Sequence, residues 1–133
     1  TKLPRLFAAQ PQNCSPIDAS FRGIKQKNNQ NNFAPTIAEG TAIKAPIRLK
    51  AIIAALKRSS GGTVAIKEND IAQATLDLAN KGLYAEPTCA TAAAAFNKLL
   101  GDGTIRSAEK TVVVLTGTGL KVTNFYQSAL EVS

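Results

Sequence analysis

A chain of 133 residues is long enough for one ordinary domain and too short for two, and its hydrophobic content of 44% suits a folded core. Histidine is absent, which excludes a histidine base or metal ligand, and Cys14 and Cys89 match no metal-ligand spacing. The net charge of +7 comes from dispersed lysines and arginines without interleaved aromatic residues, so nucleic-acid binding is disfavoured.

The sequence also predicts where in the cell the protein is located. No apolar run is long enough to cross a bilayer and no secretory signal is visible, so we expect no membrane partner. Two free thiols suit a reducing cytoplasm, which is the predicted location. The chain begins with Thr1 and contains no methionine, which hints that it is a piece of a longer protein.

The first predicted elements are a strand and a helix. Residues 5–10 form a short strand that Pro11 closes. A helix follows, with Ser15 as its cap, Pro16 in its first turn and Gly23 at its end. This order is typical of the start of an α/β domain.

The middle of the chain holds a loop and a second helix. Residues 25–33 are rich in Asn and Gln and predict an exposed loop. After Pro46, apolar residues recur at helical spacing, namely Leu49, Ile52, Ile53 and Leu56. Residues 59–62 end this helix.

The second half repeats the pattern. A strand over residues 63–67 precedes a helix that Asn69 or Asp70 caps and Gly82 ends. The alanine-rich stretch that follows predicts a long helix, with Pro87 in its first turn and Gly101 at its end. Residues 111–117 then form a strand, buried from Val112 to Leu115, and the C-terminal tail forms a last short helix.

This alternation predicts one domain over residues 1–133 of the α/β class, with a mostly parallel sheet between two layers of helices. Ligands of such sheets bind beyond the carboxyl ends of the strands. The sequence "LTGTG", residues 115–119, follows the last predicted strand and therefore lies on the ligand side. Its glycines are compatible with a plain turn or with a backbone that passes close to a ligand.

Several segments, in this order, resemble a known enzyme family. They are "PRLFAAQPQNCSPI", "TIAEGTAIKAP", "RSSGGTVAIKENDI", "YAEPTCATAAAAFNKLLGDGTI" and "KTVVVLTGTGLK". The chain resembles the C-terminal part of pyridoxal-phosphate enzymes of the tryptophan-synthase-β-like fold (fold type II), and within them the threonine synthases. The resemblance covers residues 4–121 apart from the Asn/Gln-rich insert, and "LTG-x-GLK" is its most specific element.

The resemblance also implies what is missing. Family members hold pyridoxal phosphate on a lysine and cradle its phosphate in a glycine-rich loop, both upstream of the segments seen here. Neither motif occurs in this chain. We therefore expect a fragment of a longer enzyme that has no catalytic residue of its own, is inactive alone, and acts with the remaining N-terminal part as a homodimer on a phosphorylated amino acid.

Two residues after the last predicted strand are cofactor-binding candidates. The resemblance places the hydroxyl of Thr116 at the pyridine nitrogen of the cofactor, and the backbone of Gly117 near the ring. A neutral hydroxyl does not enforce a protonated pyridinium, which suits elimination or replacement at the β or γ carbon. Turn chemistry alone also accounts for both residues. Thr118 departs from the family pattern, because many threonine synthases have histidine there.

Three further candidates lie in two other segments. Glu39 and Gly40, in "TIAEG", match the loop near the open side of the cofactor, and Glu86 begins the "EP" helix near the ring. Glu39 is equally explained as a solvated loop carboxylate, and Glu86 as a carboxylate that the helix dipole favours. Other readings remain open: a serine or threonine dehydratase fragment, another β-replacing enzyme, or a free-standing anion-binding module without catalysis.

Overall fold

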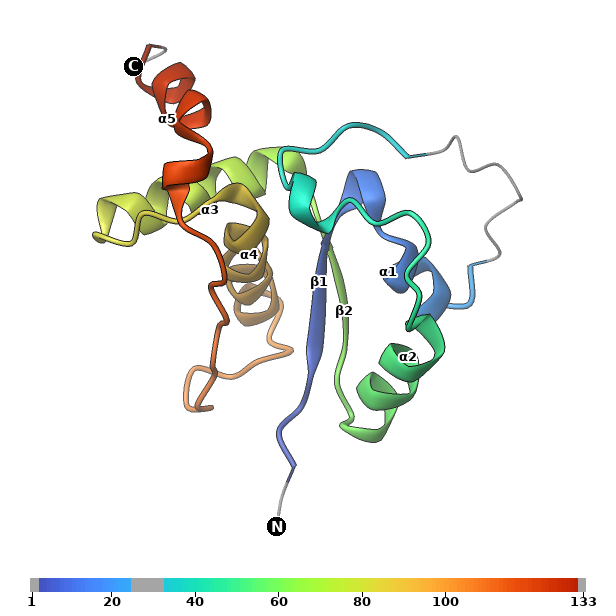
Figure 1. Ribbon diagram of the computed structural model, residues 1–133. Helices are drawn as coiled ribbons and strands as arrows, with labels where there is room; N and C mark the ends of the chain where they lie inside the picture. Colours follow the sequence, from blue (N-terminus) through green and yellow to red (C-terminus); the bar gives the residue numbers. More distant parts are fainter. Residues whose placement is uncertain (1–2, 25–32, 132–133) are drawn as a thin grey trace.

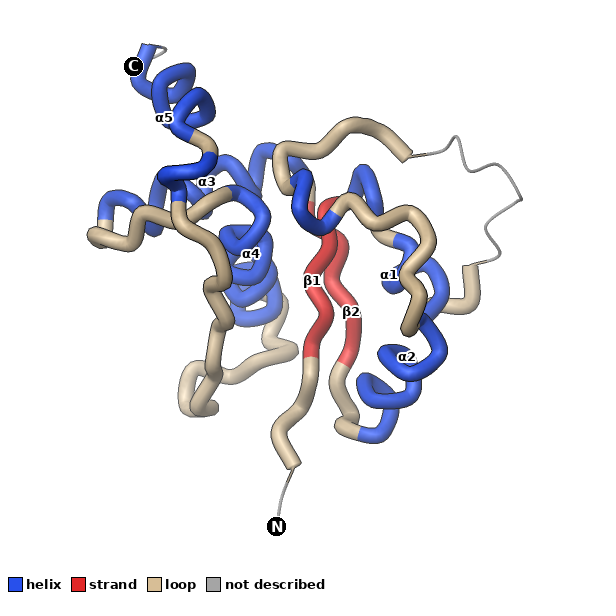
Figure 2. Tube along the Cα trace, viewed as in Figure 1, coloured by secondary structure: helices blue, strands red, loops and turns tan. Residues whose placement is uncertain are grey.

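The protein folds as a parallel β-sheet between two layers of helices (Figures 1 and 2). This computed structural model describes residues 3–24 and 33–131. In chain order its elements are β1 (Phe7–Pro11), η1 (Gln12–Cys14), α1 (Pro16–Phe21), η2 (Glu39–Thr41), α2 (Leu49–Arg58), β2 (Gly62–Ile66), α3 (Glu68–Asn80), α4 (Pro87–Gly101), η3 (Gly119–Lys121) and α5 (Thr123–Glu131), the η elements being single 3₁₀ turns.

The two strands are parallel, with Phe7 opposite Gly62 and Pro11 opposite Ile66. Between them the chain crosses over through α1 and α2, which pack on one face of the sheet, and α3 and α4 cover the other face (Figure 1). A crossover of this kind is the usual way to join parallel strands. The predicted α/β class with a parallel sheet is confirmed.

The core lies between the sheet and the α3–α4 pair. Val64 and Ile66 of β2 point into it, and Ile71 of α3 and Leu99 of α4 meet them. The small side chains of α4 let this helix approach the sheet closely, as the alanine run predicted. Apolar contact with β2 therefore fixes the position of α4, and with it the site described below.

The predicted buried strand at residues 111–117 is wrong. These residues follow an open path without strand pairing until Thr118, which forms a single antiparallel bridge with Ala85 (Figure 2). Val112 is 88% exposed and Val114 is 65% exposed. A β-branched run forms a strand only where a neighbouring strand accepts its backbone hydrogen bonds, and none of the described residues provides one here.

Helix boundaries differ from the predictions at their caps. Lys67, rather than Asn69 or Asp70, precedes α3, and the side chain of Ser15 makes no capping bond to α1. Gly23 and Gly82 take positive φ angles of 70° and 81° just after α1 and α3, as expected of glycines that end helices. Gly101 is instead the last residue of α4.

Two of the predictions concern residues that the structure describes only in part. The Asn/Gln-rich loop predicted at residues 25–33 falls, apart from Phe33, outside the described residues. Across the described ranges, no helix has the length and apolar character that crossing a bilayer requires.

Candidate cofactor site at the start of helix α4

Two chain segments far apart in sequence are joined at the start of α4. The Glu86 amide donates to the Gly117 carbonyl over 3.3 Å, and the Gly119 amide donates to the Tyr84 carbonyl over 2.9 Å. Ala85 and Thr118 form the antiparallel bridge between these two bonds. The structure therefore brings together two predicted site residues, Glu86 and Gly117.

Cys89 adds a third link to this junction. Its Sγ lies 3.1 Å from the Gly117 carbonyl oxygen and 3.2 Å from the Glu86 carbonyl oxygen, so the thiol donates between the two segments. The side chain is buried. From the sequence Cys89 was interpreted only as a small buried residue, and no sequence signal marks the bond that it makes.

Gly117 has no space for a side chain. A Cβ atom built at this position would overlap Oε1 of Glu86, whose side chain lies directly over the glycine. Gly117 does not take a positive φ angle, unlike Gly23 and Gly82. Glycine is therefore required here by close packing against Glu86 rather than by the geometry of a turn.

Gly40 approaches the same helix start from η2. Its amide donates to Oγ1 of Thr88 over 3.1 Å, and a Cβ atom at this position would lie 2.9 Å from Cγ2 of Thr88. Thr88 was not predicted as a site residue; the only available signal was a small hydroxyl residue in the first turn of the "EP" helix. Gly40, Glu86 and Gly117 therefore surround one helix terminus.

Glu39 and Thr116 are the sequence neighbours of Gly40 and Gly117, but their side chains make no hydrogen bond to any described residue. Glu39 is exposed in η2, and only its backbone carbonyl is bonded, to the Ala42 amide. Thr116 is exposed beside Gly117. The structure thus leaves the Thr116 hydroxyl available to a ligand, whereas nothing aims the Glu39 carboxylate at one.

A groove of about 880 Å³ begins at this terminus, a volume typical of small-molecule sites. Three hydroxyl residues line one end of it, namely Thr41, Thr88 and Thr116. This end lies at the carboxyl end of β1, because α4 runs in the direction opposite to β1 (Figure 1). The ligand side predicted for the sheet and the hydroxyl-lined end of the groove therefore coincide.

Tyr126 of α5 holds the junction from the outside. Its hydroxyl donates to the Ala85 carbonyl over 2.6 Å, and its ring centroid lies 4.3 Å from that of Tyr84. Burial, together with Tyr84 and Cys89 nearby, raises the pKa of Tyr126 above its ordinary value near 10. A phenol kept protonated in this way donates its hydrogen bond over the whole physiological pH range.

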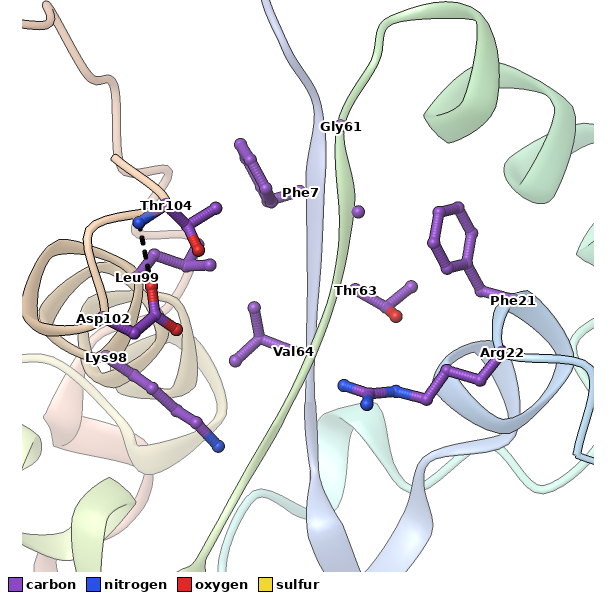
Figure 3. A pocket seen from close by; sticks show the side chains of 11 residues that line it. Phe7, Phe21, Arg22, Gly61, Thr63, Val64, Lys98, Leu99, Asp102 and Thr104 are labelled. Carbon is purple, nitrogen blue, oxygen red and sulfur yellow. Dashed lines mark hydrogen bonds between the residues drawn. The ribbon is translucent and has the colours of Figure 1, made fainter. Parts of the chain in front are cut away.

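A second, smaller cavity of about 410 Å³ lies along β2 and contains none of the predicted site residues (Figure 3). Lys98 Nζ donates to the Ala65 carbonyl of β2 over 3.1 Å, and Arg22 pairs with Asp18 over 2.9 Å. Asp102 accepts the Thr104 amide over 2.9 Å, and hydrogen bonding from the side chain and then the backbone of Thr104 lowers the pKa of this carboxyl. A lysine bonded to a strand carbonyl suits protection of a sheet edge better than ligand binding.

Comparison with known proteins identifies the family. Residues 1–117 match the family described as pyridoxal-phosphate dependent enzyme. The chain belongs to this family. Its members depend on pyridoxal phosphate, so the predicted cofactor is confirmed at the level of the family.

Curated relatives narrow the resemblance. The chain is 32% identical over 123 residues to Threonine synthase 2, chloroplastic, of Arabidopsis thaliana, and the match covers 92% of this chain and 24% of the relative. It is 35% identical over 126 residues to a threonine synthase of Methanocaldococcus jannaschii, with 90% of this chain and 30% of the relative covered. The chain therefore spans about a quarter to a third of the length of these relatives.

Proposed function

We propose that this chain is the C-terminal cofactor-site portion of a threonine synthase, which converts O-phospho-homoserine and water into threonine and phosphate. The observation that carries the proposal is the likeness to threonine synthases, 32% and 35% identical over about nine tenths of this chain. In this proposal the remaining part of the parent enzyme supplies the Schiff-base lysine and the phosphate loop. The 133-residue chain alone is then inactive.

The hydroxyl-lined end of the groove fits one side of pyridoxal phosphate. Thr116 offers an exposed, unbonded hydroxyl at the carboxyl end of β1, suited to the pyridine nitrogen. The Glu86 side chain fills the space that a side chain at position 117 would need, so Gly117 lets the Thr116 segment lie directly against the start of α4. When bound, the cofactor supplies the electron sink for the reaction.

The remaining candidates frame this end of the groove. Gly40 fixes η2 on Thr88 and sets the distance between the η2 loop and α4. We propose that Glu86 acts through Gly117 and holds the Thr116 backbone in place. Glu39 is proposed as a loop carboxylate on the open side of the cofactor.

The complete parent enzyme tests the proposal. We expect the polypeptide encoded by the reading frame that continues upstream of Thr1 to form threonine and phosphate from O-phospho-homoserine, and the 133-residue chain alone to form neither. Release of ammonia from serine or threonine would instead indicate a dehydratase. A start codon directly before Thr1, or turnover by the isolated chain, would contradict the fragment proposal.

A matched pair of variants in the parent enzyme tests the role of Thr116. We expect Thr116→Val to lower kcat about tenfold, which corresponds to one lost hydrogen bond of about 1.4 kcal/mol. Thr111→Val is the control, because Thr111 is also exposed but lies at the other end of the same segment. Equal effects of the two substitutions would remove Thr116 from the cofactor site.

A further inference from the structure

Residues 34–41, here called the edge loop, cross the carboxyl ends of the two strands and finish in η2 (Figure 1). The loop is held at its start by Asn13, which follows β1 and whose Nδ2 donates to the Pro35 carbonyl over 2.6 Å. It is held at its end by the bond from the Gly40 amide to Thr88 of α4. The edge loop therefore lies along the side of the sheet where ligands of parallel sheets bind.

Glu68 holds the middle of the edge loop. This residue begins α3 just beyond the end of β2. Its Oε2 accepts the Ile37 amide over 2.8 Å and the Thr36 hydroxyl over 3.1 Å. The Thr36 hydroxyl oxygen in turn accepts the Ala38 amide over 3.1 Å. One carboxylate oxygen therefore fixes residues 36–38, directly before η2.

Ala38 transmits this position to η2. Its side chain is fully buried in the core, so the residue cannot shift without disturbing the packing around it. Its carbonyl accepts the Thr41 amide over 3.0 Å and the Thr41 hydroxyl over 2.9 Å. Any movement of Ala38 therefore moves η2, and the hydrogen bonds that start at Glu68 determine where Ala38 lies.

The dipole of α3 does not explain how the Glu68 side chain is placed. Glu68 and Asp70 both lie in the first turn of α3, where acidic residues are favoured. Asp70 is exposed, and its side chain makes no hydrogen bond to any described residue. Glu68 turns toward the edge loop instead, although its Oε1 is then buried and accepts no hydrogen bond from the described residues. Burial of a carboxylate oxygen without a donor costs free energy, so the stability of α3 alone does not account for this arrangement.

We propose that Glu68 is a positioning residue of the cofactor site, whose carboxylate holds the edge loop so that η2 borders bound pyridoxal phosphate. The inference rests on the proposed function for the placement of Glu39 and Gly40 beside the cofactor. The bond from the Ile37 amide to the carboxylate is charge-assisted and therefore one of the stronger hydrogen bonds in a protein. Without it the edge loop is docked in only a fraction of the molecules, and the apparent affinity for the cofactor falls by the same fraction.

Cofactor titration provides the first test. The parent enzyme is freed of cofactor and titrated with pyridoxal phosphate, and binding is followed by the absorbance of the cofactor. We expect Glu68→Ala to raise the apparent Kd at least about tenfold, because both bonds to Oε2 are lost. Glu68→Gln keeps an acceptor oxygen at the position of Oε2 and should stay within about threefold of the unsubstituted enzyme. Asp70→Ala is the matched control, since it removes an acid from the same turn, and should change the Kd less than about twofold.

Amide hydrogen exchange in the cofactor-free parent enzyme provides the second test. We expect the amides of Gly40 and Thr41, neither of which bonds to Glu68, to exchange at least about fivefold faster in Glu68→Ala. Asp70→Ala should leave them unchanged, and the amides of α2 are the internal control in every variant. Thr36→Val is a milder variant that removes one bond to Oε2, and it should raise the Kd by about threefold and speed the same amides.

Equal Kd values for Glu68→Ala and Asp70→Ala would overturn the inference, as would a Kd for Glu68→Gln as high as that for Glu68→Ala. A lower Tm for Glu68→Ala with an unchanged Kd would make this residue purely structural and would overturn it too. The products of the parent enzyme are measured separately. Ammonia in place of threonine, with the expected Kd values, removes the proposed function and supports the role of Glu68. Threonine formation with equal Kd values does the reverse.

Discussion

β2 and the 111–116 segment are similar in sequence and different in structure. Both are short apolar runs rich in β-branched residues, "TVAI" and "TVVVL". β2 is paired with β1, and Ile66 is 1% exposed, whereas Val112 in the other run is 88% exposed. The difference lies in the neighbours, because β2 has a strand beside it and helices on both of its faces. Strand propensity becomes a strand only when a partner is present.

The largest expected effect lies on the buried side of this comparison. Ile66→Ala removes a side chain at the centre of the core and leaves a cavity between β2 and the α3–α4 pair. We expect the free energy of unfolding to fall by about 2–5 kcal/mol. Urea denaturation of the isolated chain measures it. A loss below about 1 kcal/mol would mean that the core relaxes around β2 far more than its packing indicates.

Gly117→Ala tests the junction where the end of the 111–116 segment packs on Glu86 at the start of α4. The new methyl group overlaps the Glu86 side chain, so we expect a loss of about 1–3 kcal/mol in the free energy of unfolding. Glu86→Ala removes the obstructing atoms, and the double variant should recover most of that loss. Chemical denaturation of the two single variants and the double variant measures this coupling.

The control for this cycle is Gly101→Ala. Gly101 ends α4, and a new Cβ there would meet no atom within 4 Å apart from its chain neighbours and the backbone of its own helix. Alanine is favoured over glycine in a helix by up to about 1 kcal/mol, so this variant should be neutral or stabilising. If Gly101→Ala were as damaging as Gly117→Ala, close packing against Glu86 would not be the reason for glycine at position 117.

Tyr126→Phe should have a moderate effect. It removes the hydrogen bond from the phenol to the Ala85 carbonyl and leaves a buried acceptor without its partner. We expect a loss of about 1 kcal/mol in the free energy of unfolding at neutral pH. No change in the denaturation midpoint would show that solvent replaces the phenol at this carbonyl.

The same tyrosine gives a pH dependence of known sign. The pKa of Tyr126 is raised in the folded protein, so the unfolded chain loses this proton first as the pH rises. The contribution of Tyr126 to stability is therefore complete below about pH 10, the ordinary tyrosine pKa, and is lost as the pH rises through the higher folded value. Between pH 8 and 11, the free energy of unfolding measured by chemical denaturation should fall less steeply for Tyr126→Phe than for the unsubstituted chain.

The sequence predicted those parts of the fold that depend on local pattern. The helix with Pro87 in its first turn, the glycines that end α1 and α3, and the strand that became β2 follow from periodicity and from the conformational freedom of single residues. The strand predicted at residues 111–117 failed because its stability depends on a partner that this chain does not contain among its described residues.

The candidate site was predictable to a similar extent. The family resemblance pointed to Glu86, Gly117 and Gly40, which the structure gathers at one helix terminus. The resemblance did not predict the roles of Thr88 and Cys89, because their hydrogen bonds depend on how η2 and the Gly117 loop meet α4. Contacts between segments tens of residues apart leave no local pattern in a single sequence. The roles of Thr116 and Glu39 remain predictions.

The smallest expected effect lies on the exposed side of the comparison. Val112→Ala in the isolated chain removes two methyl groups that already face water, so the free energy of unfolding should change by less than about 0.5 kcal/mol, as measured by urea denaturation. Val64→Ala, in the paired strand, is the matched control, because it removes the same atoms from a buried position and should cost several times more. Equal costs would mean that residues 111–116 are packed in solution, and the groove that they line would then be closed.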